Sequence, residues 1–367
     1  MYYRLVCTHC GLQSNDFASF RCKRCGSVLE VDYDYDTLVL PKNFRREKIR
    51  NAKYAPFLPV EALSAGQGEG GTPLVRKSVK GIDGVDLFFK LETKNPTNSF
   101  KDRGSAVEIT RAGELGFDSV VCASTGNMGM SVARYASRAG MNSTIFISRG
   151  GNPKKIQRIR RYGGKVVEVK KDFNEALRDA ERYAEAGGVF LCGDYHYRKE
   201  GQKTVAYEII EQLKYSVPDF IVAPVGNATL VSAIYKGLRE FENLSYIGRL
   251  PRLIAVQSSG CDPLVKAYNR GERIGYVKPD TVADAIAVGY PTFGFEAVNA
   301  IKSTGGYAVR VPDKEIIRSM KRLESVRVYT ETGGAAAFAG FSGMYRSYKR
   351  LFKGKTVVIM ATGNNER

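Results

Sequence analysis

The chain has 367 residues, of which 43% are hydrophobic, so it can bury a sizeable core and form two or three domains. This composition excludes a disordered or fibrous protein. Lysine and arginine outnumber aspartate and glutamate by 56 to 38, which gives a net charge of +18. Because the basic residues are spread along the sequence, and because an anionic substrate gains from the same field, we expect no nucleic-acid partner.

Membrane and secretion signals are not evident in the sequence. No uninterrupted apolar run approaches the roughly 20 residues that a bilayer-spanning helix needs. The first residues, Met-Tyr-Tyr-Arg-Leu, lead directly into a cysteine motif and not into the apolar core of a signal peptide. We therefore expect a soluble, cytoplasmic protein.

Two Cys-x-x-Cys pairs lie near the beginning of the chain. They are Cys7 with Cys10 and Cys22 with Cys25, and eleven residues separate them. Four thiolates at this spacing can close a tetrahedral site, and closed sites of this kind are structural because no coordination position is left for a substrate. We predict a zinc ribbon over residues 1–32. Iron is an alternative metal, and the spacing leaves open a nucleic-acid-binding ribbon.

The remainder of the chain has the pattern of an α/β protein. After a connector with a short helix expected around residues 60–63, apolar runs alternate with amphipathic segments. The expected strands are 120–123, 144–147, 165–169, 220–223, 253–256 and 356–360, and the expected helices are 128–138, 173–185, 205–213 and 335–351. Runs that are apolar at consecutive positions suit parallel strands covered on both faces. So many strands exceed one core, which favours two α/β lobes.

Three glycine-bearing loops are placed where anions are commonly bound. They are Ala-Ser-Thr-Gly-Asn-Met-Gly (123–129), Ala-Pro-Val-Gly-Asn-Ala-Thr (223–229) and Ala-Thr-Gly-Asn-Asn (361–365). Each follows a predicted strand and opens a helix, where backbone N–H groups and the helix dipole attract negative charge. One such loop would be interpreted more simply as a capping turn. Three of them, together with the loop Asn-Ser-Phe-Lys-Asp-Arg-Gly (98–104), indicate a binding site.

These motifs resemble those of the fold type II pyridoxal-phosphate (PLP) enzymes. The resemblance rests on Gly-Gly-Thr-Pro-Leu (70–74), Ser-Phe-Lys-Asp-Arg-Gly (99–104) and Ser-Thr-Gly-Asn (124–127). Within that group, residues 69–74, 198–204, the loop at 226–228 and the cysteine ribbon are most similar to the threonine synthase family. The resemblance extends from about residue 66 to residue 364. It implies a two-lobed fold like that of the tryptophan synthase β subunit, with a large domain of residues 33–97 and 205–367 and a small domain of residues 98–204.

The resemblance also implies a role for each polar part of the cofactor and the substrate. Lys101 forms the Schiff base, Asn127 hydrogen-bonds the PLP 3′-oxygen, and Thr362 lies against the pyridine nitrogen. The cofactor phosphate is bound by Gly226, Asn227, Ala228, Thr229 and Leu230. Ser124 and Thr125 receive the substrate carboxylate, while Arg198, assisted by Lys203, binds the substrate phosphate. From the residues alone, a surface salt bridge beside Glu200 explains Arg198 equally well.

Threonine synthase converts O-phosphohomoserine and water into threonine and phosphate, and a homodimer is expected by resemblance. This sequence has Met128, Gly193 and Ala287 where the family commonly has polar donors. A cysteate synthase-like β-replacement on phosphoserine and a threonine or serine dehydratase are therefore alternative functions. The alternative from outside the enzymes is a ribbon-bearing binding protein.

Overall fold

The chain divides into two compact units in a computed structural model that describes residues 2–124, 126–148, 150–169 and 173–364. Unit 1 comprises Met1–Gly71, Asn95–Thr97 and Lys101–Thr204, and unit 2 comprises Thr72–Lys94, Asn98–Phe100 and Val205–Arg367. Residues 33–71, expected in the large domain, group with unit 1. The boundary at Thr204 falls inside one helix, α5 (His196–Gln212). The domain boundaries given above stay a prediction.

The first sheet of unit 1 is a small antiparallel one. Its strand β1 (Tyr2–Cys7) pairs with β2 (Gln13–Ser14) on one side and with β3 (Leu29–Asp34) on the other. Alternate residues of β3 are buried, as expected for a strand with one face against a core. The buried side chains of this sheet belong to the same apolar cluster as residues of helices α1 (Lys101–Glu114) and α2 (Asn127–Arg138).

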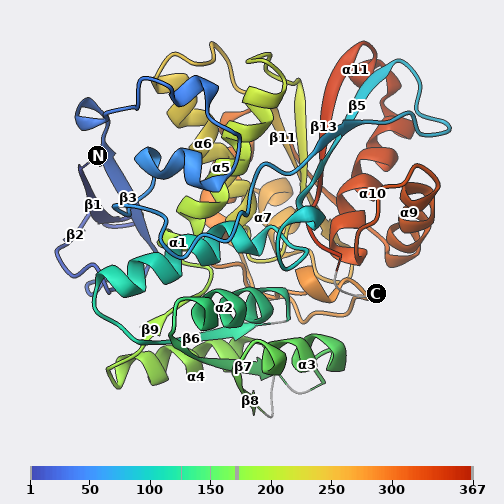
Figure 1. Cartoon of the computed structure of the whole chain (residues 1–367). Helices are drawn as coiled ribbons and strands as arrows, with labels where there is room; N and C mark the ends of the chain where they lie inside the picture. Colours follow the sequence, from blue (N-terminus) through green and yellow to red (C-terminus); the bar gives the residue numbers. More distant parts are fainter. Residues whose placement is uncertain (1, 125, 149, 170–172, 365–367) are drawn as a thin grey trace. The chain divides into compact units, whose positions relative to one another are not determined.

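The second sheet of unit 1 is parallel, in the order β8-β7-β6-β9. Its strands are β6 (Ser119–Ser124), β7 (Asn142–Ser148), β8 (Lys165–Val169) and β9 (Phe190–Leu191). On β6, Val120 and Cys122 pack with the cluster of α1 and α2, whereas Val121 and Ala123 pack with α4 (Phe173–Glu185). Because successive side chains of a strand point to opposite faces, helices cover this sheet on both sides (Figure 1). Helix α3 (Pro153–Arg161) packs beside α2.

Unit 2 contains a six-stranded sheet in the order β12-β11-β10-β13-β5-β4, which is parallel except for β4. The strands are β4 (Leu74–Arg76), β5 (Val85–Leu91), β10 (Phe220–Pro224), β11 (Arg252–Ser258), β12 (Tyr307–Val311) and β13 (Lys355–Ala361). The helices are α6 (Thr229–Asn243), α7 (Pro263–Arg270), α8 (Gly294–Ser303), α9 (Asp313–Ser325), α10 (Thr332–Ser347) and α11 (Lys349–Phe352). Small residues let α10 approach the sheet closely, since a Cβ atom on Gly340 would lie 2.5 Å from Val256.

The six strands predicted from apolar runs are confirmed, and so are the helices at 128–138 and 173–185. The short helix expected around residues 60–63 is wrong. The nearby helical segment is the 3₁₀ helix η3 (Asn51–Phe57), and the N–H groups of Glu61 and Ala65 donate instead to Glu114 and Thr110 of α1. A backbone donor that is satisfied by a tertiary partner is not available to a local helix. The other 3₁₀ helices are η1 (Tyr35–Thr37), η2 (Phe44–Arg46), η4 (Glu92–Lys94) and η5 (Asp284–Ile286).

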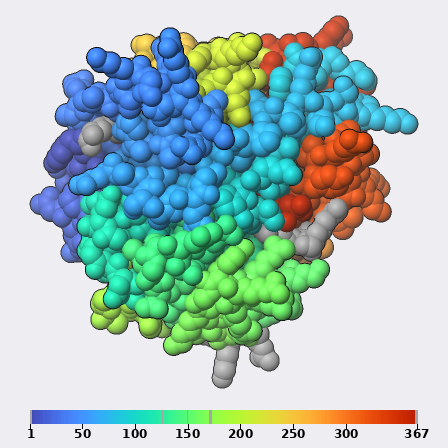
Figure 2. Space-filling view, in the orientation of Figure 1, coloured from blue at the N-terminus to red at the C-terminus, as the bar shows by residue number. Residues whose placement is uncertain are grey.

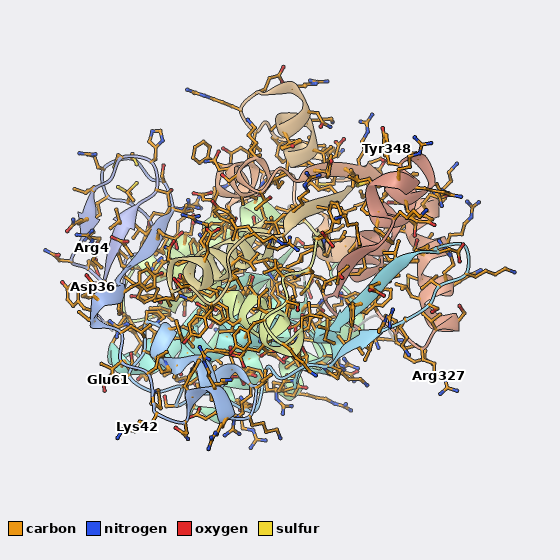
Figure 3. All side chains as sticks on the ribbon, turned by 90° about the horizontal axis from the view of Figure 1, so that it is seen from above. Arg4, Asp36, Lys42, Glu61, Arg327 and Tyr348 are labelled. Atoms are coloured by element: carbon orange, nitrogen blue, oxygen red, sulfur yellow. The ribbon has the colours of Figure 1, made fainter. Side chains whose placement is uncertain are left out.

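Many of the charged side chains lie at the surface. In Figure 3 the side chains of Arg4, Lys42 and Glu61 extend outward, and all three are exposed. The connector after β3, drawn in blue tones, forms part of the visible surface in Figure 2. Among the helices of the described residues, none is long and apolar enough to cross a membrane.

Lys90 on β5 is a charged side chain with no solvent exposure. Its ammonium lies 2.7 Å from Glu208 and also donates to the carbonyl of Thr72 and to Gln212. We expect Lys90→Met to lower the free energy of unfolding by about 3–5 kcal/mol, because it leaves the Glu208 carboxylate buried without its cation. A denaturant titration measures this change.

The matched control is Lys355→Met, which breaks a 3.1 Å ion pair with Asp219 at the surface. Exposed pairs contribute at most about 1 kcal/mol. Equal losses of stability in the two variants would contradict a special role for the buried pair.

Candidate functional site

The residues before Lys101 are held by the loop that follows strand β13. Ser99 forms an antiparallel bridge with Gly363, and the Phe100 N–H donates to the Thr362 carbonyl over 3.0 Å. Lys101 is the next residue and the first of α1. The backbone on the N-terminal side of Lys101 is therefore fixed by pairing before the helix begins.

Asp102 fixes the same segment through its side chain. Its carboxylate accepts hydrogen bonds from the backbone N–H and the hydroxyl of Thr97 and from the hydroxyl of Ser131 on α2, each 2.6 Å long. Burial raises the pKa of Asp102 to about 6, although these hydrogen bonds oppose the shift. Asp102 thus ties the 95–97 turn to α1 and α2.

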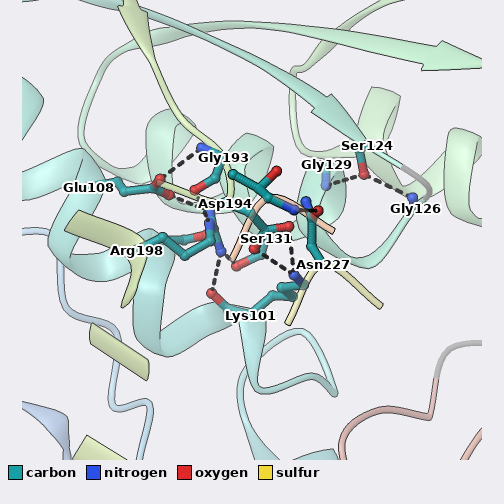
Figure 4. Close-up of polar contacts among 12 residues, drawn as sticks. Lys101, Glu108, Ser124, Gly126, Gly129, Ser131, Gly193, Asp194, Arg198 and Asn227 are labelled. Carbon is teal, nitrogen blue, oxygen red and sulfur yellow. Dashed lines mark hydrogen bonds and ion pairs between the residues drawn. The ribbon is translucent and has the colours of Figure 1, made fainter. Parts of the chain in front are cut away.

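Arg198, on α5, is fully buried against the start of α1 (Figure 4). Its guanidinium donates to the carbonyls of Gly193 and Lys101 and to the hydroxyl of Ser105, and it forms an ion pair with Glu108. The close approach requires Gly104, where a Cβ atom would lie 2.6 Å from the Arg198 side chain. The partners of Arg198 are therefore other than the two considered from the sequence, a substrate phosphate and a surface salt bridge beside Glu200. The phosphate role of Arg198 stays a prediction.

The Lys101 ammonium faces a carboxylate that the sequence analysis did not identify. Asp194 lies between β9 and α5, and its two oxygens are 3.2 and 3.5 Å from Lys101 Nζ (Figure 4). Burial lowers the pKa of Lys101, and Asp194 opposes that shift. A lowered pKa increases the share of neutral, nucleophilic amine. The one signal for Asp194 in the sequence is its place shortly after an apolar run, residues 189–192. Only two residues of that run form a strand, β9, which is too short to recognise from the sequence.

The first glycine loop joins β6 to α2, as predicted. The Ser124 hydroxyl is fully buried and accepts hydrogen bonds from the N–H groups of Gly126 and Gly129, at 2.8 and 2.7 Å. A hydroxyl has two acceptor positions and one hydrogen, so Ser124 keeps a donor. Asn127 is buried at the first position of α2. Thr125, predicted beside Ser124, lies outside the described residues.

The second glycine loop joins β10 to α6, and α6 begins at Thr229 as expected. Ala228 has a left-handed backbone (φ 65°), which is unfavourable for a residue with a Cβ atom, and no side chain caps the helix. The N–H groups at this helix start face the position where an anion is stabilised. The Asn227 side chain fixes the loop to the segment before α8, because its Oδ1 accepts a hydrogen bond from the Thr292 N–H at 2.8 Å. The loop residues Gly226, Asn227, Ala228, Thr229 and Leu230 are buried or nearly so.

Two predicted site residues remain, Thr362 and Lys203, together with the three positions where the family commonly has polar donors. Thr362 is buried, and no helix begins after it within the described residues, which end at 364. Lys203 is fully buried, 2.5 Å from Glu200 and over the ring of Tyr33. Met128 belongs to the apolar cluster of α1 and α2, and the Gly193 N–H donates to Glu108. Ala287 ends the 3₁₀ helix η5 and its N–H donates to Asp284.

The four ribbon cysteines form one cluster. The Sγ atoms of Cys7, Cys10, Cys22 and Cys25 all lie within 4.8 Å of one another. Cys7 and Cys22 are buried, and hydrogen bonding from the backbone of Leu12 lowers the pKa of Cys10 to about 6. Thiolates at these separations can serve as ligands of one metal ion.

Glu108 gives a pH-dependent prediction. Burial raises its pKa from 4.5 to about 7 in spite of Arg198. Between these two pH values the folded chain binds more protons than the unfolded chain, so stability falls as the pH rises. We expect the free energy of unfolding of the wild type to fall by about 3 kcal/mol relative to Glu108→Gln between pH 4.5 and 7. Unfolding titrations at several pH values measure this difference.

The control is Glu185→Gln, which changes an exposed carboxylate on α4 and should follow the wild type. A constant difference between Glu108→Gln and the wild type over the same pH range would contradict a raised pKa.

Comparison with known proteins places these features in one family. The pyridoxal-phosphate dependent enzyme family matches residues 65–363. The threonine synthase of Methanocaldococcus jannaschii is 37% identical over 98% of this chain and 91% of its own length. The threonine synthase of Methanosarcina acetivorans is also 37% identical, over 99% of this chain and 91% of its own length.

Solved structures agree in fold. Maize serine racemase superposes with a TM-score of 0.70 at 24% identity, over 81% of this chain and 88% of that one. Threonine deaminase isoform 2 from Solanum lycopersicum has a TM-score of 0.68 at 26% identity, over 80% of each chain. The α/β fold with parallel sheets predicted from the sequence is therefore confirmed. The chain belongs to the pyridoxal-phosphate-dependent enzymes and, within them, is a homologue of the threonine synthases.

Proposed function

We propose that this chain is a threonine synthase, which converts O-phosphohomoserine and water into threonine and phosphate. The observation that supports it most directly is Lys101, a largely buried amine held at the start of α1 within the stretch matched by the family. The threonine synthases that are 37% identical over nearly the whole chain support the substrate. A homodimer and a cytoplasmic location remain predictions that rest on the resemblance.

The residues present fit pyridoxal phosphate. Its aldehyde needs a neutral amine, and burial shifts Lys101 toward that form. Its phosphate needs N–H donors, and the uncapped start of α6 after the strained Ala228 supplies them. We propose that Gly226 to Leu230 bind the phosphate, with Asn127 at the 3′-oxygen and Thr362 at the ring nitrogen. The cofactor supplies an electron sink for charge that develops on the substrate.

The chain's own residues then bind the substrate and move its protons. The remaining donor of the Ser124 hydroxyl suits the substrate carboxylate, and Thr125 is proposed to assist it. Lys101 Nζ takes the proton from the α-carbon and then helps to remove one from the β-carbon, so that phosphate can leave from the γ-carbon. Water adds at the β-carbon, and protons return to the γ- and α-carbons.

Arg198 and Lys203 are proposed ligands of the substrate phosphate. The described partners of Arg198 are Glu108, Ser105 and two carbonyl groups, so phosphate binding would require it to exchange one of them. Lys203 would likewise have to leave Glu200. The apolar setting of Met128, where the family commonly has a polar donor, favours one second candidate with a changed substrate, a cysteate synthase-like β-replacement on phosphoserine.

Lys101→Ala tests the enzymatic function. We expect loss of the visible absorbance of the bound cofactor and a fall in threonine formation of about 10²- to 10⁴-fold, because the variant lacks both the attachment point and the base. Borohydride reduction followed by mass spectrometry should find a pyridoxyl group on Lys101 of the wild type alone. Threonine and phosphate are measured with O-phosphohomoserine as substrate.

Lys94→Ala removes an exposed lysine of η4 and should match the wild type. Phosphate release from phosphoserine with sulfite, and none from O-phosphohomoserine, would replace the proposal with the β-replacement. Ammonia from threonine or serine in place of phosphate release would indicate a dehydratase. An uncoloured wild type without any pyridoxyl group would favour the binding protein.

We propose further that the four cysteines hold a structural zinc ion. Zinc binds four thiolates tetrahedrally, and the cluster has this ligand set. We expect about one zinc ion per wild-type chain, and a loss of both zinc and thermal stability in Cys22→Ser, since Cys22 is part of the apolar cluster under the ribbon. Elemental analysis and thermal unfolding measure the two effects.

Cys261→Ser is the control, because Cys261 is a buried thiol in unit 2 and should retain zinc when changed. Iron in place of zinc, or full zinc content in Cys22→Ser, would contradict the proposal.

A further inference from the structure

Asp194 is the acidic group in contact with the Lys101 amine. Both carboxylate oxygens lie within 3.5 Å of Nζ, and the side chains of Lys101 and Asp194 are only 16% and 6% exposed. At such burial a carboxylate and an ammonium interact more strongly than at the surface. The contact is therefore a largely buried ion pair and not a solvent-exposed one.

Asp194 is the main acidic influence on Lys101 among the neighbouring charges of unit 1. The other charged groups that affect Lys101 are Arg198 and Glu108, which form an ion pair with each other. The buried thiol of Cys122 lies in the same group, and burial raises its pKa to about 12, so it is neutral near pH 7. Asp194 is the carboxylate in direct contact with the Lys101 ammonium, and its charge favours the protonated amine.

We propose that Asp194 stabilises the protonated form of Lys101 during the proton transfers. Its carboxylate orients the amine and stabilises the ammonium that forms when Nζ takes a proton from the substrate carbon. In that step the C–H bond breaks and its electron pair stays with the substrate. A new N–H bond forms on Lys101 Nζ, and the Asp194 carboxylate accepts a hydrogen bond from the resulting ammonium. The proton later returns to carbon, so no further reactant is needed. The inference rests on the proposed function, which supplies the proton transfers.

The direction of the expected pH effect follows from the charges. Asp194 stabilises the protonated amine and thereby raises the pKa of Lys101 against the effect of burial. Without the Asp194 carboxylate the pKa of Lys101 is lower. The amine then stays neutral down to a lower pH, but it holds a proton taken from the substrate less firmly. The acid limb of the rate profile should move to lower pH while the maximal rate falls.

The experiment compares the cofactor-loaded wild type with Asp194→Asn and Asp194→Ser. Both variants remove the charge, and the second also removes most of the side chain, which covers the case that one of them does not fold. We expect the maximal rate of threonine formation to fall by about 10- to 100-fold, the effect of losing a charged hydrogen-bond partner, with the acid limb shifted to lower pH. Asp194→Glu, which keeps the carboxylate, should recover part of the rate and the position of the limb.

Asp118→Asn is the matched control, because it makes the same chemical change at an exposed residue before β6 and should leave the profile unchanged. A purely structural role for Asp194 predicts less stable variants with an unmoved acid limb, and that result would overturn the proposal. So would equal rates for Asp194→Asn and the wild type.

A second measurement separates this inference from the proposed function. Exchange of the α-hydrogen of L-threonine and L-alanine with deuterated water requires the Lys101 base but no phosphorylated substrate. If the wild type exchanges this hydrogen yet makes no threonine from O-phosphohomoserine, the proposed function fails and the Asp194 variants are compared by exchange. Slower exchange with a shifted acid limb supports the inference, and unchanged exchange contradicts it.

Discussion

Helix α5 carries many charged side chains and is nevertheless largely buried. Residues 196–210 of α5 are buried, although the segment His-Tyr-Arg-Lys-Glu-Gly-Gln-Lys-Thr has the composition of a surface helix. A buried charge is tolerated only when it is paired. Arg198 therefore requires Glu108, Lys199 pairs with Glu30 of β3, and Glu208 pairs with Lys90.

Contacts within unit 1 account for three residues of the Ser-Phe-Lys-Asp-Arg-Gly motif, Asp102, Arg103 and Gly104. Gly104 leaves room for Arg198, and Arg198 in turn binds the carbonyl of Lys101. Asp102 holds the preceding turn, and the Arg103 guanidinium donates to Thr204 of α5. The lysine is thus positioned by the contacts of its neighbours, which is how a reactive group is kept in one geometry.

The ribbon is joined to the same helix. Tyr33 of β3 donates to Glu200 over 2.7 Å, and its ring lies against the Lys203 ammonium. The apolar side chains beneath the cysteines belong to the cluster of α1 and α2. A metal ion in the ribbon would therefore stabilise β3, the strand that satisfies part of the buried charge on α5, without taking part in the chemistry.

Local patterns in the sequence predicted the α/β class, the cysteine cluster, the six apolar strands and the glycine loops that follow β6 and β10, because periodicity and turn chemistry act over short distances along the chain. They also predicted Lys101 as the attachment point of the cofactor. The partners of the buried charges follow only from the folded chain, since Asp194 lies 93 residues from Lys101 and Glu108 lies 90 residues from Arg198. Which charges meet in a buried site depends on packing between distant segments, and a single sequence contains no local signal for it.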